Sequence, residues 1–260
     1  MIIALIVILA ITALILIILA ISFKNGEIAL LECFNNFNTA VFGLRGKGKD
    51  VIFNKVINAR NRTCYANIPY NRELCIEKTL NDFSVSPNTF EDIMNDDIKI
   101  IPKTLKEETD YYISDAGNLL PAQKNAELVK KYPGFPAFYS LSRHLYNMNI
   151  HYNTQALNRV WILLREQTGR WIKAEQTTSF CFFWLVTKFT VYDREASALS
   201  EMRPFKANLL NSEAKALRSD FEAKHGTIKQ YRIIQLKKHV YYDSRWFHWK
   251  LFGHKSPDTI

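Results

Sequence analysis

The chain has 260 residues, of which 48% are apolar and 23% charged, and its formal net charge is +9. This length holds one sizeable domain, alone or with an appendage, and the composition excludes an intrinsically disordered chain. The excess of basic residues favours an anionic partner, which can be nucleic acid, a nucleotide or a membrane surface.

The first predicted element is a membrane span. From Met1 to Ile21 no side chain is charged, and Thr12 is the only polar one. About 20 apolar residues, at 1.5 Å per residue, cross the roughly 30 Å hydrocarbon core of a bilayer. A signal peptide would have a basic start, a shorter apolar run and a small-x-small cleavage motif, and none is clear here. We therefore predict an uncleaved transmembrane anchor over residues 1–22 and a juxtamembrane linker over residues 23–37.

The next element has the spacing of a phosphate-binding loop, in the sequence "GLRGKGKD". The segment before it, "NTAVFG", has β propensity, and "KDVIFNKVINAR" after it places apolar residues on one helical face. Glycines let backbone N–H groups approach a phosphate, and the helix N-terminus directs its dipole at the anion. The alternative is a solvated basic hairpin. The predicted nucleotide-binding residues are Gly43, Leu44, Arg45, Gly46, Lys47, Gly48, Lys49 and Asp50.

Two residues at the end of this loop carry its predicted chemistry. Lys49 is expected to reach the terminal phosphates of ATP as a point charge. Asp50 stands where such loops have Ser or Thr, whose hydroxyl binds Mg²⁺. A carboxylate is also a hard oxygen ligand for magnesium, but it adds negative charge beside the phosphates. Asp50 is therefore a candidate metal ligand that also weakens the match.

Two later strands are expected to end at the same edge of the sheet. The first is "DYYISDAG", which places Asp115 beside the loop as a second candidate magnesium ligand. The residue that normally polarises the attacking water would come next, and here it is Ala116. The second is "NIHYNTQ", which ends in Gln155, an amide suited to positioning water or sensing the γ-phosphate. Each strand end taken alone is equally well explained as a turn or cap.

The remaining elements are less specific. "FCFFWLVTKFTVYD" is read as one long strand or two strands in a hairpin, and it is too short to cross a membrane. The segment 237–260 mixes basic and aromatic residues, which suits single-stranded nucleic acid, a membrane interface, or an ordinary terminal element equally well. Its candidate nucleic-acid contacts are Lys237, Lys238, Arg245, Trp246, Trp249 and Lys250.

The order of these motifs resembles the Zot-like assembly ATPases of filamentous phages, within the FtsK–HerA group of P-loop NTPases. The resemblance is carried by "GLRGKGKD", by "TCYANIP" as a second strand, by "YYISDAG", by "SRH" at residues 142–144 and by "NTQ" ending at Gln155. It covers residues 43 to about 173, and the order of the motifs carries it more than any single one.

The resemblance implies a RecA-like α/β domain over residues 38–236, with a mainly parallel sheet, helices on both faces and assembly into a ring. It implies Lys49, Asp115 and Gln155 as catalytic residues, with magnesium on Asp50 and Asp115. Arg143 or Arg165 would reach the nucleotide of a neighbouring subunit. The expected cofactors are ATP and Mg²⁺, and phage single-stranded DNA or virion proteins are expected partners.

Three departures from the family leave two hypotheses open. Asp50 stands where the family has Ser or Thr, and Ala116 stands where it has a catalytic Glu. The apolar segment precedes the ATPase domain, whereas the phage proteins typically carry it afterwards. The first hypothesis is a single-pass inner- or plasma-membrane ATPase with its domain in the cytoplasm, which drives DNA export or virion assembly. The second is a membrane-tethered nucleotide- or DNA-binding scaffold that does not hydrolyse ATP.

Overall fold

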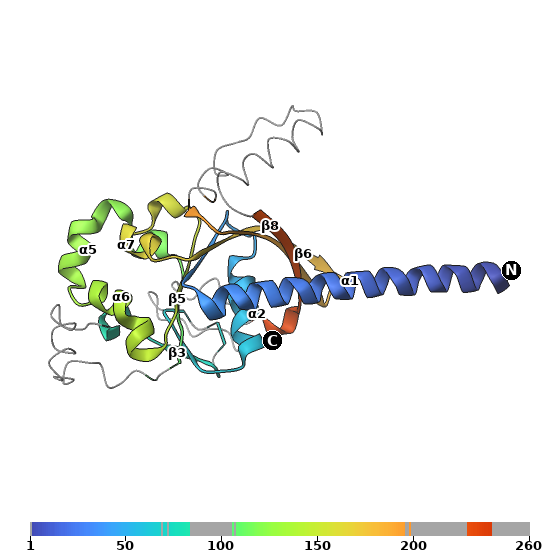
Figure 1. The fold of residues 1–260 in the computed structure, drawn as a ribbon, viewed down its shortest axis with the longest axis horizontal. Coiled ribbons are helices and arrows are strands. Elements are labelled where there is room, and N and C mark those ends of the chain that lie inside the picture. Colours follow the sequence, from blue (N-terminus) through green and yellow to red (C-terminus); the bar gives the residue numbers. More distant parts are fainter. Residues whose placement is uncertain are drawn as a thin grey trace, which may run out of the picture.

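The computed structural model contains one mixed sheet with helices on both faces and a long N-terminal helix that projects from it (Figure 1). The structure describes residues 2–68, 70–71, 73–83, 106, 108–195, 198 and 228–240. The projecting helix is α1, Ile2–Asn36.

In the described residues the sheet has eight strands, in the order β3-β2-β4-β5-β1-β6-β7-β8. The strands are β1 (Thr39–Phe42), β2 (Cys64–Ala66), β3 (Cys75–Glu77), β4 (Tyr111–Ile113), β5 (Ile150–Thr154), β6 (Arg170–Phe180), β7 (Trp184–Tyr192) and β8 (Ile228–Leu236). From β3 to β6 every pairing is parallel, and β7 and β8 complete the sheet in antiparallel pairings. The predicted α/β architecture with a mainly parallel sheet is confirmed. The segment "FCFFWLVTKFTVYD" supplies the last residue of β6, the β6–β7 turn and the whole of β7. It is therefore part of a hairpin, and the rest of β6 lies before it.

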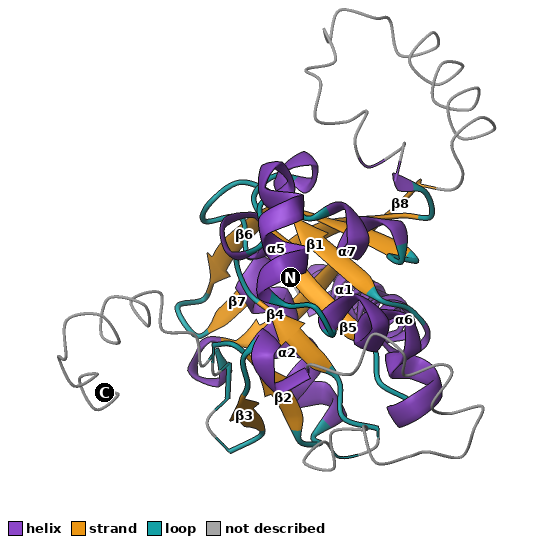
Figure 2. Ribbon diagram, turned by 90° about the vertical axis from the view of Figure 1, so that its left-hand side faces the viewer, coloured by secondary structure: helices purple, strands orange, loops and turns teal. Residues whose placement is uncertain are grey.

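The central strands of the sheet are buried because helices cover both of its faces. Every residue of β1, β2, β4 and β5 is buried, which is the pattern of a sheet without a solvent face. The covering helices are α2 (Lys49–Arg60), α4 (Ala116–Leu119), α5 (Asn125–Lys131), α6 (Phe135–Tyr146) and α7 (Ile162–Glu166). Helices α1 and α2 build the core on one face, and α4 to α7 build the core on the other. Figure 2 shows the strands with helices around them in a second view.

The helix α1 has two different parts. Its first part is apolar and exposed from Ile6 onward, and by length and composition it is the one helix in the described chain able to cross a membrane. Its second part packs into the domain, where Leu30 and Phe34 are fully buried. At Gly26 the helix lies so close to β8 that a Cβ would overlap the carbonyl oxygen of Arg232.

The predicted linker, residues 23–37, is therefore helical up to Asn36 and supplies core side chains. The sequence did not indicate this, because only the contacts with β8 and α2 in the folded protein distinguish these residues from a tether.

Candidate nucleotide-binding site

The Gly-rich loop joins β1 to α2 and is held tightly against the neighbouring strands. Gly43, Gly46 and Gly48 have φ angles of 145°, 77° and 94°, a region that favours glycine. A Cβ on Gly43 would lie 2.6 Å from the carbonyl oxygen of Ala174, and one on Gly48 would overlap the hydroxyl of Thr177. The loop therefore requires glycine at two positions for packing as well as for its backbone angles.

Thr177, on β6, holds this loop through a hydrogen bond. Its hydroxyl oxygen lies 3.2 Å from the backbone carbonyl of Lys47, to which it donates, and 2.8 Å from the hydroxyl of Thr187. Sequence reasoning missed both threonines, because nothing in an exposed-looking "QTTSF" indicates a neighbour 130 residues away.

Lys49 begins α2 and turns back over the loop. Its ammonium group donates to the carbonyl oxygens of Gly43 (2.9 Å) and Leu44 (3.2 Å), and the residue is only 7% exposed. Burial lowers the pKa of this ammonium, while the charges of Asp50 and Asp115 oppose that shift. The structure thus places a cation and two carboxylates at one edge of the sheet, and their roles in binding nucleotide and magnesium stay predictions.

Asp50 is anchored by two donors. Its Oδ1 accepts a hydrogen bond from Asn153 Nδ2 at 2.8 Å and from the Tyr70 hydroxyl at 3.2 Å. Burial raises the pKa of the carboxyl group, and Lys49 together with these hydrogen bonds partly offsets that rise. The carboxylate is therefore held in one orientation beside Lys49.

Asn153, on β5, connects the two acids. Its amide nitrogen donates to Asp50, and its Oδ1 accepts the backbone N–H of Asp115 at 2.8 Å. Asn67, at the end of β2, holds Ser114, the residue before Asp115. Its Oδ1 accepts the backbone N–H of Ser114 at 2.7 Å, and its Nδ2 donates to the Ser114 carbonyl at 3.1 Å. Sequence reasoning missed both asparagines. The available signal for Asn153 was an amide side chain within "IHYNT", a strand that is buried throughout.

Gln155 follows β5, which lies between the loop strand β1 and the strand β4 that leads to Asp115. Its side chain is exposed, and the preceding carbonyl of Thr154 accepts the N–H of Gly43 at 3.3 Å. Ala116 is fully buried at the start of α4. Topology therefore brings Gln155 to the loop, and the position after Asp115 offers no proton-accepting side chain.

The remaining candidates lie in different surroundings. Arg165 is mostly buried and pairs with Glu195 of its own chain at 3.2 Å, whereas Arg143 is exposed on α6. Lys237 and Lys238 are exposed in a single 3₁₀ turn after β8. Four further candidates lie outside the described residues: Arg245, Trp246, Trp249 and Lys250.

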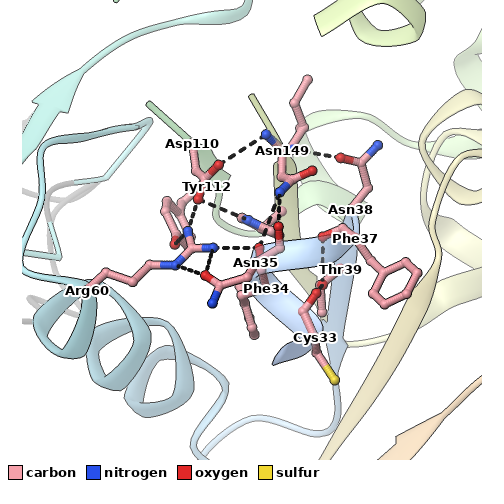
Figure 3. A network of polar contacts seen from close by, with 12 residues as sticks. Cys33, Phe34, Asn35, Phe37, Asn38, Thr39, Arg60, Asp110, Tyr112 and Asn149 are labelled. Atoms are coloured by element: carbon pink, nitrogen blue, oxygen red, sulfur yellow. Dashed lines mark hydrogen bonds and ion pairs between the residues drawn. The ribbon is translucent and has the colours of Figure 1, made fainter. Parts of the chain in front are cut away.

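A second polar cluster lies at the far end of α2, away from the loop (Figure 3). Arg60 forms an ion pair with Asp110, and both side chains are almost fully buried. Arg60 also donates to Asn35 Oδ1 (2.9 and 2.6 Å) and to the Phe34 carbonyl (2.6 Å) at the end of α1. His151 Nε2 lies 3.7 Å from Asp110 Oδ2. The cluster ties α1 and α2 to β4 and β5, and sequence reasoning did not find it.

Asp50 and Asp115 fit a magnesium ion that arrives with a nucleotide. Magnesium is usually held by one or two carboxylates together with phosphate oxygens and water. The two donors on Asp50 occupy one carboxylate oxygen, Oδ1, in the described part of the chain. These residues would hold the ion, and its charge would neutralise the phosphates.

The fold is α/β with a mainly parallel sheet, and its Gly-rich loop has the strand–loop–helix setting of a phosphate-binding loop. No family model and no curated protein matches the sequence. Among solved structures, the chain is similar to the N-terminal domain of zonular occludens toxin from Neisseria meningitidis, with 14% identity, a TM-score of 0.40 and coverage of 78% of this chain and 95% of that one.

It is also similar to the genome packaging NTPase B204 from Sulfolobus turreted icosahedral virus 2. The complex of B204 with AMPPCP gives 12% identity and a TM-score of 0.41, covering 76% of this chain and 97% of that one. The complex with ATP-gammaS gives 16% identity and a TM-score of 0.40, covering 77% and 99%.

Proposed function

We propose that this protein is a membrane-anchored, ATP-dependent motor that moves DNA or virion components during virus assembly. The observation that carries the proposal is the joint placement of Lys49, Asp50 and Asp115 at the loop, with Asn153 bonded to the last two. Three charged groups and a buried amide converge at the carboxyl edge of a parallel sheet. A solvated basic hairpin, the alternative for this loop, would not account for that convergence.

In the proposed mechanism, the backbone N–H groups of residues 43–49 and the dipole of α2 bind the phosphates. Lys49 exchanges its bonds to the loop carbonyls for bonds to the terminal phosphates. Asp50 and Asp115 would hold magnesium, which would supply neutralisation of the phosphate charge. Gln155 positions water at the same edge. Since Ala116 has no carboxylate, Gln155 and the two acids are the groups left to orient that water.

The first part of α1 is proposed to cross the host inner or plasma membrane, with the NTPase domain in the cytoplasm, where ATP is available. The predicted ring places nucleotide between subunits. We propose Arg143 for the contact in trans, because Arg165 is occupied by Glu195 within its own chain.

The second candidate function is a membrane-tethered scaffold that binds nucleotide without turnover. The observation that favours it is the buried Ala116 in place of the acid that polarises water. Steady-state ATP hydrolysis by the full chain in detergent, with and without single-stranded DNA, separates the two functions.

The substitution Lys49→Ala tests the site itself. It removes one charged hydrogen-bond donor, so we expect ATP affinity to fall about tenfold or more, because such a bond contributes about 1.5–3 kcal/mol. Lys130→Ala, which removes an equal charge from the exposed side of α5, should leave the affinity unchanged. Equal affinities for Lys49→Ala and the unmodified chain, measured by calorimetry, would reject the loop as a nucleotide site.

A further inference from the structure

The tip of the β6–β7 hairpin exposes a run of apolar side chains. Phe182 is 89% exposed and Phe183 is 71% exposed, and Phe180 and Trp184 on either side are also accessible. Cys181, between them, is an exposed free thiol. Scattered exposed apolar residues are ordinary, but a contiguous aromatic run on a turn indicates a contact surface.

The turn itself does not explain these residues. Cys181 and Phe182 have φ angles of 47° and 61°. The loop between the paired residues Phe180 and Trp184 has three residues. Positive φ is favourable for Gly, Asn and Asp, and bulky residues in this region are strained. Because the sequence departs from the most stable turn, we attribute its apolar character to what the tip contacts.

The hairpin points in the same direction as the projecting part of α1. Helix α1 runs antiparallel to β8, because Ala29 and Cys33 lie beside Lys229 and Tyr231 whereas the earlier Gly26 lies beside Arg232. Toward its N-terminus the helix therefore follows β8 toward Leu236. Leu236 pairs with Trp184 at the hairpin tip.

The tip lies level with the apolar part of the helix. Leu236 is four residues beyond Arg232, which is about 13 Å at roughly 3.3 Å per strand residue. A helix covers that distance in about six to nine residues, depending on the crossing angle of the axes. Counted back from Gly26, the tip reaches the level of about residues 17–20 of α1, where Ile17 and Ile18 are exposed.

Basic residues lie just behind the tip. The backbone N–H of Lys237 donates to the carbonyl of Phe183 at 2.7 Å, and Lys237 and Lys238 are both exposed. On the helix, the exposed Lys24 follows the apolar run. Aromatic side chains backed by lysines match the boundary between acyl chains and anionic headgroups.

We propose that the β6–β7 tip inserts into the headgroup boundary of the membrane that α1 crosses, with Lys237 and Lys238 on anionic lipid. The domain would then have two membrane contacts, and the second would fix its orientation on the bilayer. This inference rests on the proposed membrane anchoring by α1. It assigns the two lysines to lipid, and nucleic acid becomes an outcome of the test.

The test uses the full chain in vesicles of phosphatidylcholine and phosphatidylglycerol, with an environment-sensitive fluorophore on Cys181. Nitroxide-labelled lipids report contact with the bilayer, and iodide reports contact with water. A Cys181→Ser chain corrects for label on the other thiols, of which Cys33 and Cys64 are buried. The reference site is Val129→Cys in that background, exposed on α5 at the opposite end of the molecule from the projecting helix (Figure 1).

The expected result is that nitroxide lipids quench the Cys181 label while iodide does not, and that the label at position 129 behaves in the opposite way. Each basic residue near an anionic surface changes binding about fivefold. Replacing both lysines, by Lys237→Gln and Lys238→Gln, should therefore lower the inserted-to-free ratio of the tip roughly 25-fold.

Four results would overturn the proposal. Iodide quenching of the Cys181 label in chains that still float with the vesicles would show a free tip, with the anchor intact. Protection from both quenchers would place the tip against another copy of the protein. Protection that appears only with an added oligonucleotide would assign the surface to nucleic acid. Chains that fail to float would remove the anchor, and with it both this inference and the membrane part of the proposed function.

Discussion

Substitution of Asp110 by Asn is expected to destabilise the fold far more than substitution at a surface ion pair. Asp110 is 4% exposed and pairs with Arg60, which is 7% exposed. Removing one partner of a buried pair typically lowers the free energy of unfolding by about 3–5 kcal/mol, because the other charge stays buried without compensation.

The structure places Asp110→Asn at the lower end of that range. Arg60 keeps its bonds to Asn35, to the Phe34 carbonyl and to the Tyr112 hydroxyl. The new amide oxygen can still accept the Asn149 N–H, which lies 3.1 Å from Asp110 Oδ1. We therefore expect a loss of about 3 kcal/mol, equivalent to a fall in Tm of about 6–12 °C for a domain of this size.

The assay is thermal unfolding of the full chain in detergent, followed by near-ultraviolet circular dichroism. The matched control is Glu127→Gln, which breaks the Lys124–Glu127 pair, whose side chains are 59% and 71% exposed. This control should change stability by about 0.5 kcal/mol or less. Similar shifts for the two variants would refute the reasoning, because the Arg60–Asp110 ion pair would then not behave as a buried pair.

Three further outcomes are expected. Asp50→Thr should hold or increase the affinity for magnesium-ATP measured by calorimetry, because it removes a carboxylate from beside the phosphates; loss of turnover with binding retained would show that Asp50 takes part in the chemistry. Burial, with a contribution from nearby Arg60, depresses the pKa of His151 well below 6.5, so only the unfolded chain gains a proton as the pH falls below that value. The urea midpoint should therefore fall on acidification and depend less on pH in His151→Gln, and equal slopes would contradict this account. Leu30→Ala should lower the free energy of unfolding by about 2–5 kcal/mol in urea titration, because it leaves a cavity under α1, whereas a tether would tolerate it.

Patterns that span a few residues were predictable. The strand, glycines and helix around Gly43–Asp50 follow from local propensities, and the parallel order follows from buried strands that alternate with helices. The placement of Lys49 beside Asp50 and Asp115 was predicted for the same reason, since the carboxyl ends of parallel strands meet at one edge.

The sequence by itself therefore determined the loop, its strand–helix frame and the long apolar helix, because each is written in contiguous residues. Only the tertiary structure decided that Asn153 bridges two acids, that Arg60 meets Asp110, and that the second half of α1 belongs to the core. It also decided that the aromatic tip lies level with the apolar helix. These features depend on strand order and on contacts between segments distant along the chain, and local composition does not specify the partner of a buried polar side chain.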